Sequence, residues 1–69
     1  MNNTEYLKAM GAKIRSARKL KGIYLRDLGE MCNLHYGAIS EIETGKRNSH
    51  ILTLKSIADF LGVNVKEFV

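Results

Sequence analysis

The stretch LGEMCNLHYGAISEIETG, from Leu28 to Gly45, indicates two short helices joined by a tight turn. Leu28 and Cys32 lie four residues apart and therefore share one face of the first helix. Asn33 follows at the place where a helix is commonly stopped by a left-handed residue, a role that glycine fills best and asparagine next best. Leu34 then provides an apolar residue for the corner. The stretch predicts helix, turn and helix.

The second of these helices has two unlike faces. Ile39, Ile42 and Glu43 recur at helical spacing on one side, and Gly45 ends the helix. The outward face between them is polar and aromatic, and its residues are Tyr36, Gly37, Ser40 and Glu41. A short helix with one anchored face and one polar face is suited to lie in the major groove of DNA.

At these residues the chain resembles the helix-turn-helix of the phage Cro/repressor-type (XRE-like) DNA-binding family. Three further segments agree in order and spacing: IRSARKLKG at 14–22, EIETGKRNS at 41–49 and LTLKSIADFLGV at 52–63. Each fragment alone is weak, whereas the whole series is specific. The resemblance covers about residues 10–68. It implies an all-α fold, a compact bundle of about five short helices around the helix-turn-helix, in a single domain over residues 1–69.

Size and composition agree with one small domain. The chain has 69 residues, 45% of them apolar, and a net charge of +4, which suits a polyanionic partner. Its single cysteine, Cys32, excludes an internal disulfide and fits a reducing compartment. No apolar run approaches the ~20 residues that span a membrane, and no signal peptide is evident. We therefore expect a cytoplasmic protein with no membrane association.

The segments on either side of the central stretch also predict helices. Asn2 and Thr4 belong to a polar start, with Thr4 a candidate N-cap for a first helix that ends near Lys21. Ser49 or His50 should cap a later helix, and Asn64 a short final turn. The apolar stripes of the two longer helices are Leu7, Met10, Ile14 and Ala17, and then Leu54, Ile57, Ala58 and Leu61.

Arg18 interrupts the pattern of the first helix, because it lies on the inward edge beside Ala17. In the family that the chain resembles, an arginine here pairs with a glutamate near the end of the recognition helix, which corresponds to Glu43. The resemblance therefore implies a partly buried Arg18–Glu43 ion pair between the two helices. The alternative is a pair of unrelated surface charges, although charged residues are seldom buried unless they are paired.

The resemblance also implies the residues that contact DNA. The base-contact candidates are His35, at the start of the helix, and the outward residues Tyr36, Gly37, Ser40 and Glu41. Glu41 can only accept hydrogen bonds, which suits a cytosine amino group. Gly37 either lets the backbone approach DNA closely or is simply tolerated, at about 1 kcal/mol relative to alanine. The phosphate-contact candidates are Tyr24, Leu25, Arg26, Lys46, Arg47 and Asn48.

The chain departs from the family where the shorter helix begins, near Tyr24 and Leu25. The family usually has Ser or Thr as a cap there, followed by a Gln that contacts a phosphate. The Tyr24 hydroxyl is too remote to cap its own helix in the manner of Ser. Backbone amides can still face a phosphate, and Arg26 can supply the missing contact. One backbone anchor is therefore in doubt, but the motif remains.

No metal, cofactor or small-molecule site is expected. Cys32, His35 and His50 make an incomplete ligand set without a fourth member at standard spacing. Cys32 lies on the apolar stripe with Leu28, which favours a small core residue. Nothing in the chain indicates an enzyme.

The pattern as a whole predicts a transcriptional regulator, expected to be a repressor, that binds double-stranded DNA as a homodimer. The dimer-interface candidates are Phe60, Val65, Phe68 and Val69, of which Val65 and Phe68 can also complete the core. The alternative is a protein-interaction module, antitoxin-like or an anti-repressor partner, that uses the same helical face. The apolar residues Tyr24, Leu25 and Tyr36 favour that alternative slightly, whereas Arg26, Lys46 and Arg47 favour DNA.

Overall fold

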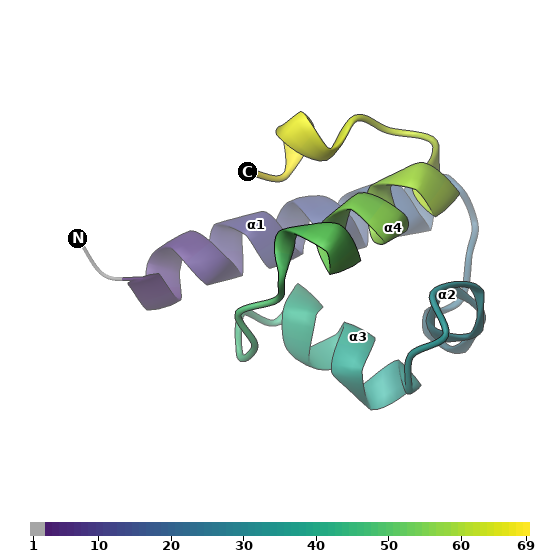
Figure 1. Ribbon diagram of the computed structural model, residues 1–69, viewed down its shortest axis with the longest axis horizontal. Helices are drawn as coiled ribbons and strands as arrows, with labels where there is room; N and C mark the ends of the chain where they lie inside the picture. The colour runs from purple at the N-terminus through teal and green to yellow at the C-terminus, as the bar shows by residue number, and fades with distance from the viewer. Residues whose placement is uncertain (1–2) are drawn as a thin grey trace.

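The computed structural model describes residues 3–69, so the expectation for Asn2 lies outside the described residues. The elements in order are α1 (Asn3–Leu20), α2 (Leu25–Met31), α3 (Tyr36–Glu43), α4 (Ile51–Leu61) and η1 (Val65–Glu67) (Figure 1). No strand occurs within this range. The all-α prediction is confirmed.

The expected bundle of about five short helices needs a correction. The structure has four α-helices, and the fifth element, η1, is a single 3-10 turn. Asn64 and Phe68 close this turn from either side, and the Phe68 amide donates to the Val65 carbonyl at 3.0 Å. In so short a segment, the backbone amides and carbonyls pair through hydrogen bonds between residues three apart. In addition, α1 is not short, since it has 18 residues.

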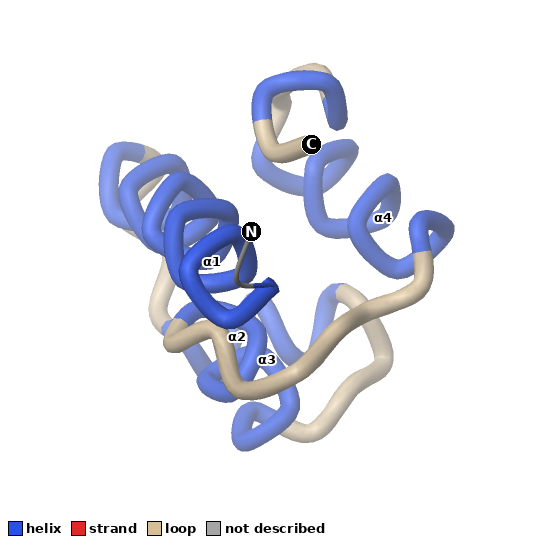
Figure 2. Tube along the Cα trace, turned by 90° about the vertical axis from the view of Figure 1, so that its left-hand side faces the viewer, coloured by secondary structure: helices blue, strands red, loops and turns tan. Residues whose placement is uncertain are grey.

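The helices form two groups. In Figure 1, α2 and α3 lie below α1 and α4, and η1 lies above them. Figure 2, turned by 90°, also shows α2 and α3 below α1, with the C-terminal turn beside α4. The groups are in contact, because α3 packs on α1 as well as on α2, and α4 contacts α1, α2 and η1. The helix-turn-helix therefore projects from one side of the molecule.

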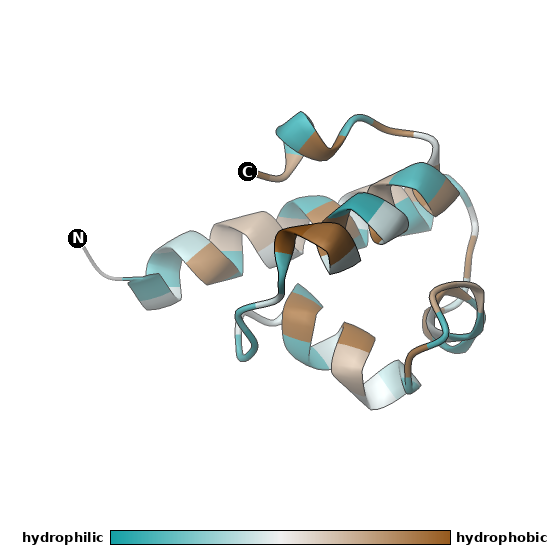
Figure 3. Cartoon of the chain, in the orientation of Figure 1, coloured by the Kyte–Doolittle hydropathy of each residue, from teal (hydrophilic) through white to brown (hydrophobic). Residues whose placement is uncertain are grey.

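The core lies where the apolar stripes meet. Its buried residues are Met10, Ile14, Leu28, Ile39, Ile42, Leu54, Ile57, Ala58, Leu61 and Phe68. The partly buried Leu7, Ala17, Cys32 and Leu34 pack against them. In Figure 3, brown and teal segments alternate along the helices, as expected when one side of each helix faces the core. None of the described helices is both long enough and apolar enough to cross a bilayer.

The ends of the elements follow their local sequence. Asn33 has a φ of 57°, and Gly45 and Gly62 have φ values of 77° and 71°, so each takes the left-handed conformation that ends a helix. His50 caps α4, because its Nδ1 accepts from the Leu52 amide at 3.1 Å. Thr4 is not the N-cap of α1, since helical geometry already begins at Asn3 and Thr4 lies inside the first turn.

Candidate DNA interface

The position of α3 is set by its buried face. Ile39 and Ile42 are fully buried, and α3 packs closely on α1 at Gly11. A Cβ atom built on Gly11 would lie 2.3 Å from the Ile42 carbonyl oxygen and 2.5 Å from that of Glu43. The two backbones therefore meet without an intervening side chain. Sequence reasoning missed Gly11, whose only signal is a glycine next to Met10 on the apolar stripe.

A two-pronged ion pair fixes the end of α3. Arg18 Nε donates to Glu43 Oε2 at 2.7 Å, and Arg18 Nη2 donates to Glu43 Oε1 at 3.1 Å. The remaining prong, Nη1, donates to the Ile23 carbonyl at 2.9 Å. The exposed fractions of the Arg18 and Glu43 side chains are 11% and 5%. The structure thus brings together the two charges that the resemblance pairs.

The start of α3 is capped by a residue expected to face DNA. His35 Nδ1 accepts from the Gly37 amide at 3.0 Å, and the imidazole ring lies 4.5 Å from the Tyr36 ring, centroid to centroid. A Cβ atom at Gly37 would lie 3.0 Å from the same Nδ1. Gly37 therefore leaves room for this cap, a local reason for glycine that the sequence did not reveal.

The expected outward face of α3 is only partly open to solvent, since Gly37 is half-buried. Tyr36 and Glu41 are exposed, and Ser40 is half-buried. Thr44 extends this face by one turn, and its hydroxyl donates to the Ser40 carbonyl at 2.9 Å. Sequence reasoning missed Thr44, although its spacing of four residues from Ser40 places it on the same face.

Two of the cations expected to contact phosphates lie against this face. The guanidinium carbon of Arg26 is 5.9 Å from the centroid of the Tyr36 ring, a cation–π distance. Arg47 Nη2 and Nε both donate to Glu41 Oε1, at 2.8 and 3.1 Å. Lys46 is exposed and makes no ion pair with any residue between 3 and 69. Arg47, expected to contact a phosphate, is thus in contact with Glu41, expected to contact a base.

The start of α2 lacks a side-chain cap, as the sequence led us to expect. Tyr24 occupies the N-cap position and makes no capping hydrogen bond through its side chain. It is 77% exposed, and with Leu25, Arg26, Asp27 and Tyr36 it lines a shallow slot of about 430 Å³. The slot adjoins the outward face of α3, because Tyr36 belongs to both. It gives this side of the molecule a more apolar character than the cations alone suggest.

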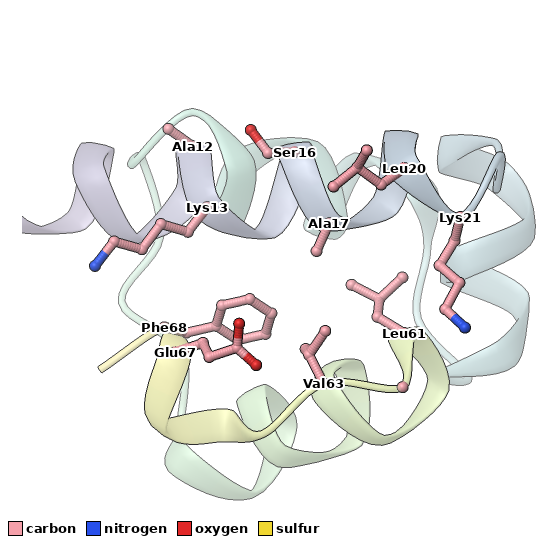
Figure 4. Close-up of a pocket in the computed structure, with 11 residues that line it drawn as sticks. Ala12, Lys13, Ser16, Ala17, Leu20, Lys21, Leu61, Val63, Glu67 and Phe68 are labelled. Carbon is pink, nitrogen blue, oxygen red and sulfur yellow. The ribbon is translucent and has the colours of Figure 1, made fainter.

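A larger groove, of about 760 Å³, lies between α1, the end of α4 and η1 (Figure 4). Its apolar lining includes Ala17, Leu61 and Phe68, and its charged residues are Lys13, Lys21 and Glu67. None of the lining residues belongs to α2 or α3, so the groove is separate from the outward face of α3. The sequence did not predict this groove; the expectation of no small-molecule site remains a prediction.

The dimer-interface candidates do not share one environment. Phe68 is only 3% exposed and belongs to the core, so it is not a free surface residue. Val65 is half-buried, whereas Phe60 and Val69 are exposed. The reason is that η1 folds back over the core and inserts Phe68 into it.

Cys32 behaves as a core residue. It is partly buried against the core, and this burial raises the pKa of its thiol by disfavouring the charged thiolate. Within residues 3–69, no three His, Cys, Asp or Glu side chains are placed to hold a metal ion.

Comparison with known proteins gives a consistent result. The family description for helix-turn-helix domains of the HTH_3 type matches residues 14–68. The chain is similar to the clp gene regulator ClgR from Corynebacterium glutamicum, with 35% identity over 91% of this chain and 67% of that one and a TM-score of 0.88. It is also similar to the S. venezulae BldD DNA-binding domain, with 33% identity over 94% and 97% of the two chains and a TM-score of 0.83.

A third similarity shows the fold alone. The restriction-modification controller protein C.AhdI from Aeromonas hydrophila is 22% identical over the whole of both chains, with a TM-score of 0.93. No curated protein matches the sequence significantly. The family match covers most of the chain, and the two relatives above 30% identity agree with it. The chain therefore belongs to the HTH_3 (XRE-type) helix-turn-helix family of DNA-binding transcriptional regulators.

Proposed function

We propose that this protein is a sequence-specific repressor that binds a pseudo-palindromic operator in double-stranded DNA as a homodimer, with α3 in the major groove. The observation that carries this proposal is the outward face of α3. Tyr36 and Glu41 are open to solvent on that face, while Ile39 and Ile42 hold the opposite face in the core. A helix fixed in this way can present hydrogen-bonding groups to base edges, which is how sequence is read.

The cations around α3 support DNA as the partner. Arg26 precedes α3, and Lys46 and Arg47 follow it, so positive charge flanks the proposed reading face. Contacts to phosphates fix the register of a protein on the duplex and supply most of the affinity that does not depend on sequence. Tyr24, Leu25 and Asn48 complete the proposed phosphate contacts.

The homodimer is supported by the apolar residues near the C-terminus. Val69 is exposed and, with Tyr6 and Ile51, borders a groove of about 360 Å³. Phe60 is exposed and Val65 half-buried, whereas Phe68 supports the surface from the core. A two-fold dimer would place its α3 helices in successive major grooves, roughly 34 Å apart. The proposed repression, in the cytoplasm, would result from such a dimer covering a promoter and excluding the polymerase.

The test is selection of genomic DNA fragments by the purified chain, followed by footprinting of the enriched fragments. We expect a common sequence with two protected half-sites separated by one helical turn. Protection of one asymmetric half-site would contradict the dimer, and enrichment of no sequence would contradict the proposed function as a whole.

A second candidate function rests on the slot beside Tyr36. Tyr24, Leu25 and Tyr36 give that slot apolar walls, which is more than a DNA reader needs. A protein-interaction module would use this surface to bind another polypeptide. The two functions are separated by the same selection, because an interaction module would enrich no DNA sequence even at low salt.

A further inference from the structure

Glu41 and Arg47 form a contact between the proposed reading helix and the loop that follows it. Two donors of the guanidinium, Nη2 and Nε, point at the single carboxylate oxygen Oε1, at 2.8 and 3.1 Å. The Arg47 and Glu41 side chains are 49% and 50% exposed, so both remain accessible to a bound duplex. Lys46, the neighbouring cation, takes no part in an ion pair with the described residues and provides a natural comparison.

We infer that Glu41 makes Arg47 a determinant of sequence specificity, although Arg47 itself contacts no base. Glu41 releases Arg47 to a phosphate only when a base donates a hydrogen bond to Glu41. This inference rests on the proposed function. It differs from the assignment of Arg47 as a plain phosphate contact, which would strengthen binding to every sequence equally.

The first step is competition for the guanidinium. Its Nε and Nη2 edge is the planar fork that grips a carboxylate or a phosphate with two parallel hydrogen bonds. In the free protein this fork is occupied by Glu41. Arg47 therefore cannot offer the same edge to a phosphate while it remains on Glu41.

The second step is the cost to Glu41 of losing Arg47 as its partner. In water the exposed pair is weak, worth at most about fivefold in an equilibrium constant. Against a duplex the situation changes, because the phosphates are negative and the bound helix displaces part of the water in the groove. A carboxylate left there without a partner is disfavoured much more strongly. Glu41 therefore keeps Arg47 unless another donor replaces it.

The third step identifies that donor. In the major groove the amino group at N4 of cytosine can donate to a carboxylate. Adenine also carries an amino group, but its acceptor N7 lies beside it and repels the carboxylate. On a duplex with cytosine at this position, both Glu41 and Arg47 find partners on the DNA. On other duplexes Arg47 stays with Glu41, and the two-pronged phosphate contact through its Nε and Nη2 edge is lost.

The number of phosphate contacts can be measured from the salt dependence of binding. Each contact contributes about 0.9 to the slope of log affinity against log salt for double-stranded DNA. The inference therefore predicts that Arg47 contributes to this slope on the selected sequence and not on a scrambled one. Lys46 should contribute equally to both.

The experiment uses the full chain, a duplex enriched from a random-sequence pool by the wild-type protein, and a scrambled duplex of the same composition. The affinity of wild type, Arg47→Ala, Lys46→Ala and Glu41→Gln is titrated by fluorescence anisotropy at several salt concentrations. We expect Arg47→Ala to lower the slope by about 0.9 on the enriched duplex only, and Lys46→Ala to lower it on both. Glu41→Gln should raise the slope on the scrambled duplex by a similar amount, because Arg47 is then free.

The double variants exclude simple charge repulsion. If Glu41 acts by holding Arg47, the rise caused by Glu41→Gln disappears in the Arg47→Ala background and persists in the Lys46→Ala background. A rise of equal size in both backgrounds, or equal loss of slope on both duplexes from Arg47→Ala, would overturn the inference and leave the proposed function standing. Failure of the wild-type protein to enrich any duplex would overturn both.

Discussion

Arg18 on α1 and Glu43 at the end of α3 face each other through two parallel hydrogen bonds of 2.7 and 3.1 Å, nearly out of contact with water. Because Arg18 also donates to the Ile23 carbonyl, one guanidinium joins α1, the segment before α2, and α3. The pair therefore holds the angle at which α3 leaves the bundle. An interaction with this geometry affects both the stability of the fold and the orientation of α3, the proposed reading helix.

Removing the carboxylate should be strongly destabilising. Glu43→Ala leaves the guanidinium of Arg18 buried without its counter-charge, and we expect a loss of about 3 kcal/mol or more in the free energy of unfolding. Urea denaturation measures this loss. Replacing both residues with apolar side chains of similar volume should cost much less, because no charge is then left unpaired. Small, equal effects of both variants would show that the pair is an ordinary surface feature.

The contact at Gly11 predicts an unusual effect of alanine within a helix. Gly11→Ala should gain about 1 kcal/mol in helix propensity. The added methyl group would overlap the carbonyl oxygens of Ile42 and Glu43, at 2.3 and 2.5 Å, and force α1 and α3 apart. The cost of overpacking, about 3 kcal/mol, exceeds that gain, so we expect a net loss of about 2 kcal/mol in the free energy of unfolding, measured by thermal or urea denaturation.

A matched control is available at the next position. Ala12 is exposed on α1, so Ala12→Gly should lose only about 1 kcal/mol, the propensity difference itself. If Gly11→Ala instead stabilised the protein by that same amount, the close approach of α1 and α3 would be disproved.

Burial of Cys32 predicts low chemical reactivity. Desolvation raises the pKa of its thiol, so the reactive thiolate is scarcer at neutral pH than in an exposed cysteine. Modification by a thiol reagent should be at least several-fold slower in the folded protein than in urea-unfolded protein, and should accelerate only as the pH rises. Equal rates in the folded and unfolded chains would contradict the core assignment.

Much of the fold could be predicted because it depends on neighbours in the chain. Asn33 and Gly62 end helices through their own backbone freedom, and the stripe from Leu54 to Leu61 follows from helical periodicity. The expected outward face of α3 likewise follows once Ile39 and Ile42 are placed inward. These rules need no knowledge of which helices meet.

The features that escaped prediction depend on residues far apart in the chain or on side-chain choice. Gly11 matters only because α3 crosses α1 at that position. Phe68 belongs to the core because η1 returns over it, whereas the sequence alone leaves Phe68 open to a surface role. Arg47 pairs with Glu41, but its long side chain can reach several partners, and sequence spacing does not determine which of them it contacts.

The proposed dimer predicts a shared loss of assembly and DNA binding. Val69→Asp places a charge on an exposed apolar residue of the proposed interface and should shift sedimentation from dimer to monomer, with weaker binding to the selected duplex. Phe68 is unsuitable for this purpose because its substitution would damage the core.

A charge introduced elsewhere provides the control for this variant. Leu20→Asp changes another exposed apolar residue, on α1 and outside the proposed interface, and should leave the sedimentation coefficient unchanged. A wild-type protein that sediments as a monomer at high concentration would exclude the homodimer.

Reading and anchoring should respond differently to substitution. Tyr36→Ala removes a ring from the outward face of α3, so it should weaken binding to the selected duplex by about 1–3 kcal/mol and affect scrambled DNA much less. Lys46→Ala removes a cation without an ion-pair partner among the described residues, so it should weaken both complexes and lower the salt slope by about one unit. Titration of both variants against both duplexes at several salt concentrations measures these effects. If Tyr36→Ala retained the full ratio of the two affinities, Tyr36 would not read bases, and the slot that it lines with Tyr24 would have to be explained by a protein partner.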